Sequence, residues 1–193
     1  METHGRGWVF TPAHFKGMGN RAAIETALRR HKNSGTIRQL ARGLYDYPRH
    51  DQQLGTLMPS IDMIVAALEA RDAVRLQPSG AYAANLLGLS DQVPMRVVFL
   101  TDGPSRSIRI GNLDIILRRT TPRNMAPSGR VSGTVIQALR FLGRKNVDQQ
   151  IVDRLRERLS TSDKHQLMKD IRHAPIWIAE IIRKLAGEDT TAL

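Results

Sequence analysis

The sequence predicts an α+β protein, in which an N-terminal winged helix-turn-helix is followed by a mixed α/β body that ends in a helical C-terminal region. Three observations indicate this fold class. The first 50 residues contain, in order, a short helix, a glycine turn, a longer amphipathic helix and two β-prone runs. Further β-prone runs lie between residues 74 and 119. From about residue 128 onward the apolar residues recur at helical spacing.

Two helices are expected in the first 50 residues. An extended run over 5–10 leads into Thr11-Pro12, and proline is favoured at the first position of a helix, so a short helix is predicted over 12–16. Gly17-Met18-Gly19 makes a tight turn. A second helix is predicted over 20–33, because its apolar residues share one stripe. The residues of that stripe are Ala23, Ile24, Ala27 and Leu28.

A β-hairpin is predicted directly after the second helix. Ser34-Gly35 is a typical helix stop, and the β-prone runs 36–41 and 44–47 flank a turn at Gly43. Pro48 ends the second strand. From the apolar pattern of the helix and the hairpin, we expect four side chains to be buried. They are Ile24, Ala27, Leu28 and Leu40.

A polar segment over 51–59 is predicted to link this first domain, 1–50, to a body over 60–193. Ser60 is a candidate N-cap for the first helix of the body, and Ser162-Asp163 for a later one. The elements expected in the body are a helix over 61–73, a strand over 74–77, a helix over 79–87, a strand over 95–101, a hairpin over 107–110 and 113–119, and helices over 131–142, 148–159, 163–171 and 175–186.

The net charge of +11, from 29 basic and 18 acidic side chains, indicates a polyanionic partner. Residues 1–60 carry nine basic and four acidic side chains, so the excess is greatest there for its length. The absence of cysteine excludes disulfides and thiolate chemistry. The histidines lack metal-ligand spacing, and the chain has no phosphate-binding loop or nucleophile elbow. We therefore expect no cofactor, no metal and no catalytic residues.

Composition also bears on location and on the core. No apolar run approaches the roughly 20 residues of a membrane span, so we expect no membrane partner and a cytoplasmic protein. Aromatic residues make up 5% of the chain, so the core is expected to rest on aliphatic side chains and methionine.

The polar face of the helix over 20–33 is the candidate site, and double-stranded DNA is the candidate partner. In a winged helix-turn-helix this helix enters the major groove and the hairpin lies along the backbone. Arg21, at the helix N-terminus, can pair with a guanine edge, and Glu25 can accept a hydrogen bond from cytosine. Basic side chains further along the helix and on the hairpin are expected at phosphates. The candidate DNA-binding residues are Asn20, Arg21, Glu25, Thr26, Arg29, Arg30, Lys32, Arg38 and Arg42.

Three runs of this sequence resemble the N-terminal half of AbiEi-like antitoxin transcriptional regulators, and the last of the three is the most distinctive. They are Gly5-Arg6-Gly7-Trp8-Val9-Phe10-Thr11-Pro12, Arg21-Ala22-Ala23-Ile24, and Gly35-Thr36-Ile37-Arg38-Gln39-Leu40-Ala41-Arg42-Gly43-Leu44-Tyr45-Asp46-Tyr47-Pro48. The motif match covers residues 5–48. Relatives in that family carry a further helix before the Gly-Arg-Gly run, so the first helix of this domain is expected to be absent or truncated here.

The resemblance implies a repressor of its own operon that acts as the antitoxin of a type IV toxin-antitoxin system. Its functional partner would be a nucleotidyltransferase-like toxin, which it counteracts without a stable complex. A homodimer, or cooperative binding along DNA, remains open. Two other classes are alternatives: a protein-interaction module that binds a toxin directly, and an enzyme that acts on nucleic acid.

Overall fold

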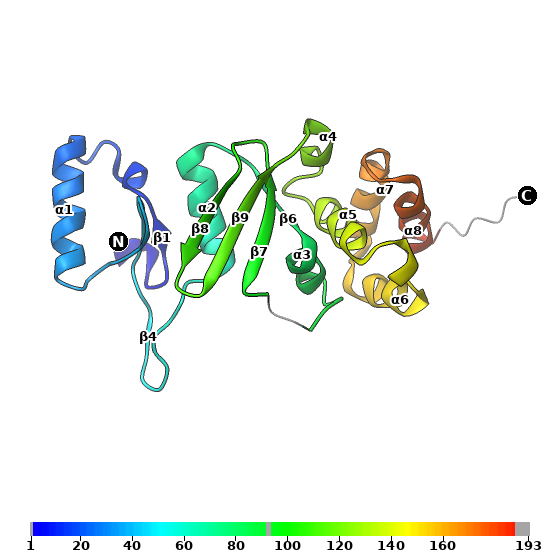
Figure 1. The fold of residues 1–193 in the computed structure, drawn as a ribbon, viewed down its shortest axis with the longest axis horizontal. Coiled ribbons are helices and arrows are strands. Elements are labelled where there is room, and N and C mark those ends of the chain that lie inside the picture. The colour runs from blue at the N-terminus through cyan, green and yellow to red at the C-terminus, as the bar shows by residue number, and fades with distance from the viewer. Residues whose placement is uncertain (1, 92–93, 188–193) are drawn as a thin grey trace, which may run out of the picture. The chain divides into compact units, whose positions relative to one another are not determined.

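The computed structural model describes residues 2–91 and 94–187, and the chain divides into two compact units (Figure 1). The first unit comprises residues 1–74 together with 109–111, and the second comprises 75–108 and 112–193. Helices and separate β-sheets occur in the described ranges, so the chain is a mixed α and β protein, as the sequence predicts. The first helix that we expected in the body groups instead with the first unit.

The first unit is built on a three-stranded antiparallel sheet. Its strands are β1 (Val9–Phe10), β2 (Arg38–Ala41) and β3 (Leu44–Asp46), in the spatial order β1-β3-β2. Between β1 and β2 the chain forms the 3-10 turn η2 (Pro12–Phe15) and the helix α1 (Arg21–Asn33). The short helix, the long helix and the hairpin that the sequence predicts are therefore all present, although the first is a single tight turn.

Aromatic side chains form the core of this unit. The Phe10 ring stacks on that of Trp8 with 4.7 Å between centroids, and it meets the Phe15 ring edge-on at 5.5 Å. The buried members of the cluster are Trp8, Phe10, Leu28 and Ile37, and Phe15, Ile24, Tyr45 and Tyr47 pack against them. The aliphatic core expected from composition is wrong for this unit, because most of the aromatic residues of the chain lie between residues 8 and 47.

Burial of α1 and the hairpin is less complete than predicted. Leu28 is buried, but Ile24 and Ala27 are half-buried, because the helix meets the sheet along one edge of its apolar stripe. Leu40 is also half-buried, since the pairing of β2 with β3 shifts register around it. Its neighbour Ile37 takes the place in the core.

The two faces of this sheet have different neighbours. Phe10 faces α1, and Val9, which precedes it on the strand, points to the opposite face. On that face the helix α2 (Ile61–Asp72) contacts β1. The Nη1 of Arg71 on α2 also donates to the backbone oxygen of Arg42, at 3.1 Å. The sheet therefore lies between α1 and α2.

The segment predicted as a linker over 51–59 contains a second hairpin. Its strands are β4 (His50–Asp51) and β5 (Gly55–Thr56), which pair antiparallel with His50 opposite Thr56. The polar, glycine-containing sequence that indicated a linker is equally typical of a hairpin turn.

The second unit contains a four-stranded sheet, in the order β6-β7-β9-β8, and a helical region. Strand β7 runs antiparallel to β6 and parallel to β9. The elements are β6 (Leu76–Ser79), α3 (Gly80–Leu86), β7 (Arg96–Thr101), β8 (Arg106–Ile110), β9 (Leu113–Arg119), α4 (Pro122–Met125), α5 (Val131–Leu142), α6 (Gln149–Arg158), α7 (Thr161–Asp170) and α8 (Ile176–Ala186), and the last two residues of β8 group with the first unit. Helix α7 begins earlier than predicted because Ser160 caps it: the Oγ of Ser160 accepts a hydrogen bond from the N–H of Asp163 at 3.2 Å.

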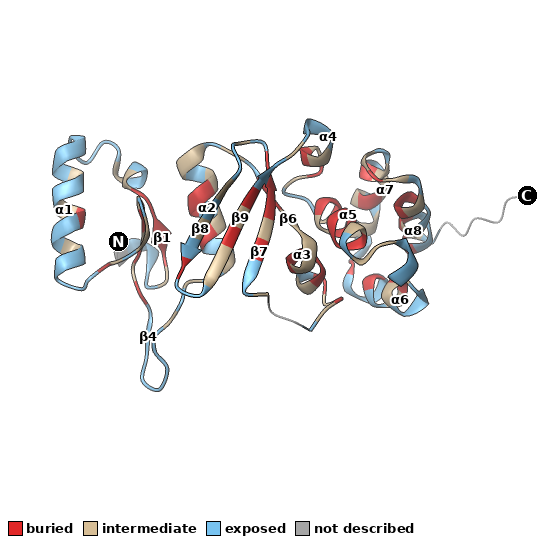
Figure 2. Cartoon of the chain, in the orientation of Figure 1, coloured by how far each residue is buried: buried red, intermediate tan, exposed pale blue. Residues whose placement is uncertain are grey.

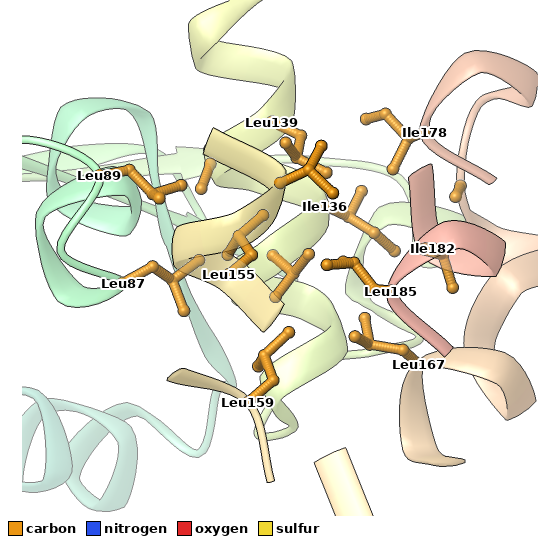
Figure 3. Packing of buried hydrophobic residues seen from close by; sticks show 14 of the residues in the cluster. Leu87, Leu89, Ile136, Leu139, Leu155, Leu159, Leu167, Ile178, Ile182 and Leu185 are labelled. Carbon is orange, nitrogen blue, oxygen red and sulfur yellow. The ribbon is translucent and has the colours of Figure 1, made fainter. Parts of the chain in front are cut away.

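The helical region of the second unit has an aliphatic core (Figure 3). Leu139 on α5, Leu155 on α6, Leu167 on α7 and Ile182 on α8 are all completely buried within it. Each of these helices turns one apolar stripe inward, as the periodicity of the sequence predicts. In the part of the chain that the structure describes, no helix is both long enough and apolar enough to span a bilayer.

Phe10 is expected to be a major contributor to the stability of the first unit. Phe10→Ala should lower the free energy of unfolding by about 3–5 kcal/mol, because it removes a completely buried ring and leaves a cavity. Phe141→Ala is the matched control, since that ring is 52% exposed, and its effect should be about 1 kcal/mol or less. Urea unfolding followed by circular dichroism measures both, and equal losses would contradict the assignment of Phe10 to the core.

Candidate nucleic-acid interface

Most of α1 faces solvent (Figure 2). Leu28 is the one fully buried residue of this helix. The exposed positions include every candidate residue that the sequence places on it: Arg21, Glu25, Thr26, Arg29, Arg30 and Lys32. The helix is thus held along one edge and presents a broad polar face to solvent.

Arg21 and Glu25 form an ion pair on this face. The Arg21 Nε lies 2.8 Å from the Glu25 Oε1, and the two side chains are 93% and 56% exposed. The hydrogen bond and charge of Glu25 raise the pKa of Arg21 above its ordinary value. Exposed pairs of this kind contribute little to stability, because water competes for both charges. Both side chains are therefore available to exchange this contact for other polar groups.

Asn20 and Lys32 have structural partners at the two ends of α1. The Oδ1 of Asn20 accepts a hydrogen bond from the backbone N–H of Ala23 at 2.8 Å, so Asn20 is the N-cap. The Nζ of Lys32 donates to the Oε1 of Gln39 on β2, also at 2.8 Å. This contact ties the end of the helix to the sheet.

The remaining cations of the candidate set divide into two groups. Among the described residues, the side chains of Arg29, Arg30 and Arg42 make no hydrogen bond or ion pair. Arg38 differs, because its guanidinium donates to both carboxylate oxygens of Asp46, at 3.1 and 2.6 Å, and to the backbone oxygen of Leu57 at 2.9 Å. The Asp46 side chain is 1% exposed.

Arg38 is therefore a clamp inside the first unit, and the phosphate contact expected of it from the sequence stays a prediction. Arg38 and Asp46 are directly opposite each other on β2 and β3, and partners in register point to the same face of a sheet. A buried carboxylate requires a nearby charge and hydrogen-bond donors, and the fork of arginine supplies both.

A basic cleft lies beside the sheet of the first unit. Its volume is about 610 Å³. The cleft is lined by Lys32, Gly35, Ile37, Arg38, Gln39, Ala41, Arg42, Pro48, His50 and Thr56. His50 and Thr56 were not predicted as site residues, because they belong to the expected linker. The pairing of β4 with β5 brings them to the rim, and no local sequence signal shows that the hairpin lies beside β2.

An apolar groove lies along the part of α1 that the sheet does not cover. Its volume is about 360 Å³, and it is lined by Phe15, Met18, Ala23, Ile24, Ala27, Leu28 and His31. Met18 is 80% exposed. The groove exists because the sheet covers only one edge of the apolar stripe of α1.

The motif residues that carry the family resemblance form internal contacts. The Nη1 of Arg6 donates to the backbone oxygen of Pro48 at 3.1 Å, and its guanidinium lies 4.9 Å from the centre of the Tyr47 ring. Gly7 has a φ of +95°, and a Cβ there would lie 2.8 Å from the Cδ of Arg49. The first and last parts of the motif therefore fasten to each other. The Gly-Arg-Gly and Tyr-Pro parts of the motif therefore have a structural role.

A model of a family of unknown function, DUF6088, matches residues 1–167. The chain belongs to DUF6088. The match extends over the first unit and most of the second, so it includes α1, the basic cleft and both hairpins of the first unit. No curated protein matches the chain.

One solved structure with some likeness to this DUF6088 chain is that of the RV2827C protein from Mycobacterium tuberculosis. The two are 14% identical, and the similar region covers 94% of this chain and 72% of that one, with a TM-score of 0.45. A likeness at this level is too low to carry an argument about fold or function.

Arg38→Ala is expected to destabilise the protein by about 3–5 kcal/mol, because it leaves the carboxylate of Asp46 buried without its partner. Arg42→Ala, at an exposed arginine on the same hairpin, is the control and should change stability by about 0.5 kcal/mol or less. Thermal and urea unfolding measure the difference. If Arg38→Ala left stability unchanged, the clamp would be disproved.

Proposed function

We propose that this chain is a non-enzymatic, sequence-specific DNA-binding repressor that acts as the antitoxin of a type IV-like toxin-antitoxin pair. The observation that carries the proposal is the presentation of α1. A helix anchored by Leu28 exposes arginines on its outward face and ends beside a basic cleft. Duplex DNA matches both features, because it is a polyanion and its major groove is wide enough to admit an α-helix.

The order of elements supports a winged helix-turn-helix. Strand β1, turn η2, helix α1 and the β2–β3 hairpin follow one another, and the sheet order is β1-β3-β2. In this interpretation η2 and α1 are the helix-turn-helix, with α1 as the recognition helix, and β2–β3 is the wing.

The outward face of α1 has side chains suited to groove reading. Ala22 and Thr26 are one turn apart at its centre, where short side chains let the backbone approach the base edges. Arg21 and Glu25 flank them near the N-terminus and offer a donor fork and an acceptor. Arg29 and Arg30, which follow, have no competing partner among the described residues and are placed for phosphates.

The antitoxin role rests on the resemblance of residues 5–48 to AbiEi-like regulators. In that assignment the promoter is controlled by the first unit, and the second unit opposes a nucleotidyltransferase-like toxin without a stable complex. The separate cores of the two units support such a division, because each surface can change without disturbing the packing of the other. We place the protein in the cytoplasm, where both its DNA target and the toxin would be found.

A second candidate is a module that binds its toxin directly, and the apolar groove beside α1 favours it. Exposed apolar surface next to a helix is typical of protein-protein contact. Co-purification of the two proteins decides between the candidates: a stable complex that Met18→Asp disrupts supports the module, and its absence together with toxin rescue supports the type IV assignment.

Charge removal on α1 separates base reading from phosphate contact. On a duplex selected by the full chain from a random pool, Arg29→Ala with Arg30→Ala should flatten the slope of log affinity against log salt by about 2, because two phosphate contacts are lost. Arg21→Ala should instead weaken binding to the selected duplex more than to a scrambled one, by about tenfold or more. Fluorescence anisotropy titrations measure both effects. Equal losses on the two duplexes would make Arg21 a phosphate contact.

Repression and toxin rescue should be separable. Lys32→Glu with Arg42→Glu reverses two cations of the basic cleft and leaves the Arg38–Asp46 clamp in place, so it should abolish binding to the promoter and derepress it. Rescue from the toxin should persist when this variant is expressed from an independent promoter. A folded variant that lost both activities together would contradict the two-function assignment. Gln150→Ala, an exposed change in the second unit, is a control for repression.

A further inference from the structure

The β4–β5 hairpin has a defined shape but gains nothing from the core. All its residues from Arg49 to Thr56 are exposed, and Figure 1 shows the hairpin extending away from the sheet of the first unit. A two-stranded hairpin is marginally stable by itself in water. An element with paired strands that adds no buried surface is suited to contact with a partner.

The turn of this hairpin is held by its own side chain. The Oδ1 of Asp51 accepts hydrogen bonds from the backbone N–H groups of Gln53 and Leu54, at 2.8 and 2.9 Å. The hydrogen bond from Leu54, and then that from Gln53, holds the pKa of Asp51 below its ordinary value. Gly55 follows with a φ of +72°, which suits glycine. The tip residues Gln52, Gln53 and Leu54 are therefore presented in a fixed turn.

The base of the hairpin is fixed to the basic cleft. Leu57 donates its N–H to the backbone oxygen of Arg49 at 2.9 Å, and its own oxygen accepts from the Arg38 clamp. His50 and Thr56, which are opposite each other on the two strands, line the cleft together with Lys32 and Arg42. A phosphate backbone bound by those two cations would run past the base of the hairpin.

The chemistry of the tip differs from that of the cleft. It carries no cation between residues 51 and 56, so it is not suited to phosphates. Glutamine amides can donate to the acceptors that adenine N3 and thymine O2 expose in the minor groove. The Leu54 side chain is 77% exposed, and proteins that bind the minor groove use such apolar side chains as wedges between base steps.

We propose that the β4–β5 hairpin is a second DNA-contacting arm, whose tip enters the minor groove next to the phosphates held by Lys32 and Arg42. This inference rests on the proposed function, because it requires α1 to bind the adjacent major groove. It adds a contact to A·T-rich sequence beside the site that α1 reads. Gln52 and Gln53 supply the hydrogen bonds, and Leu54 supplies the apolar contact.

The test uses the full chain and a short duplex that it selects from a random pool. The tip variant is Gln52→Ala, Gln53→Ala and Leu54→Ala together, which leaves Asp51 and Gly55 in place. Its affinity should fall by about tenfold to a hundredfold, with an unchanged salt slope because no phosphate contact is lost. Gln150→Ala with Ile176→Ala, an exposed glutamine and an exposed aliphatic residue of the second unit, is the matched control and should bind as the unaltered chain does.

Methylation interference identifies the groove. Dimethyl sulfate modifies guanine N7 in the major groove and adenine N3 in the minor groove, so the unaltered chain should be sensitive to both. The tip variant should lose the adenine N3 sensitivity and keep that at guanine N7. Gln53→Glu, which preserves side-chain size but removes the donor, should show the same loss and guards against a folding defect in the triple variant.

The outcomes distinguish this inference from the proposed function. If the chain selects no duplex, both are overturned. If it selects a duplex with guanine N7 interference, but the tip variant binds equally well or no adenine N3 interference exists, the arm is disproved and the repressor stands. A tip variant that binds DNA normally but loses toxin rescue would overturn the arm in favour of a protein-binding hairpin.

Discussion

The stability of the first unit depends on Phe10, the residue of β1 whose ring packs toward α1. Strand β1 has two residues, and its one aromatic side chain, Phe10, clusters with Trp8 and with Leu28 of the helix. Because these rings are large, a small core can hold α1 through Leu28 and two half-buried neighbours. Because so few residues of α1 contact the core, the rest of the helix is exposed to water. The helix can therefore carry cations outward without any of them being desolvated in the free protein.

The high net charge of the chain is not all available for binding. Arg38 neutralises the buried Asp46, Arg6 fastens the two ends of the motif, and Arg71 joins α2 to the β2–β3 turn. Arginine suits such positions because its planar fork makes several hydrogen bonds while staying charged. Arg29 and Arg30 on α1, whose side chains have no partner among the described residues, are the more informative ones. A count of basic residues therefore overstates the charge that is free for a partner, and a count of the unpaired ones corrects it.

The two units use different chemistry to solve the same packing problem. The first relies on aromatic rings around a short strand, and the second relies on interlocking leucine and isoleucine side chains from four helices. A core made from several helices tolerates loss of any single surface contact, whereas the aromatic core has few members. The stability of the first unit therefore depends on a small number of residues, and several of them belong to the sequence motif over 5–48. The motif residues make the contacts that stabilise the fold, and the exposed side chains between the parts of the motif are the ones available to a partner.

The sequence by itself determined most of the elements and the polar face of α1. Helical spacing of Ile24, Ala27 and Leu28 and the glycine turns are local signals, and local signals fix secondary structure. Tertiary structure alone decided how much of each stripe is covered, that Arg38 is occupied by Asp46, and that 50–56 is a hairpin beside the basic cleft. These outcomes depend on strand order and register, which join residues distant in the sequence. The neighbouring residues in the sequence indicate whether a side chain lies at the surface. Whether its charge is already paired depends on the strand opposite it.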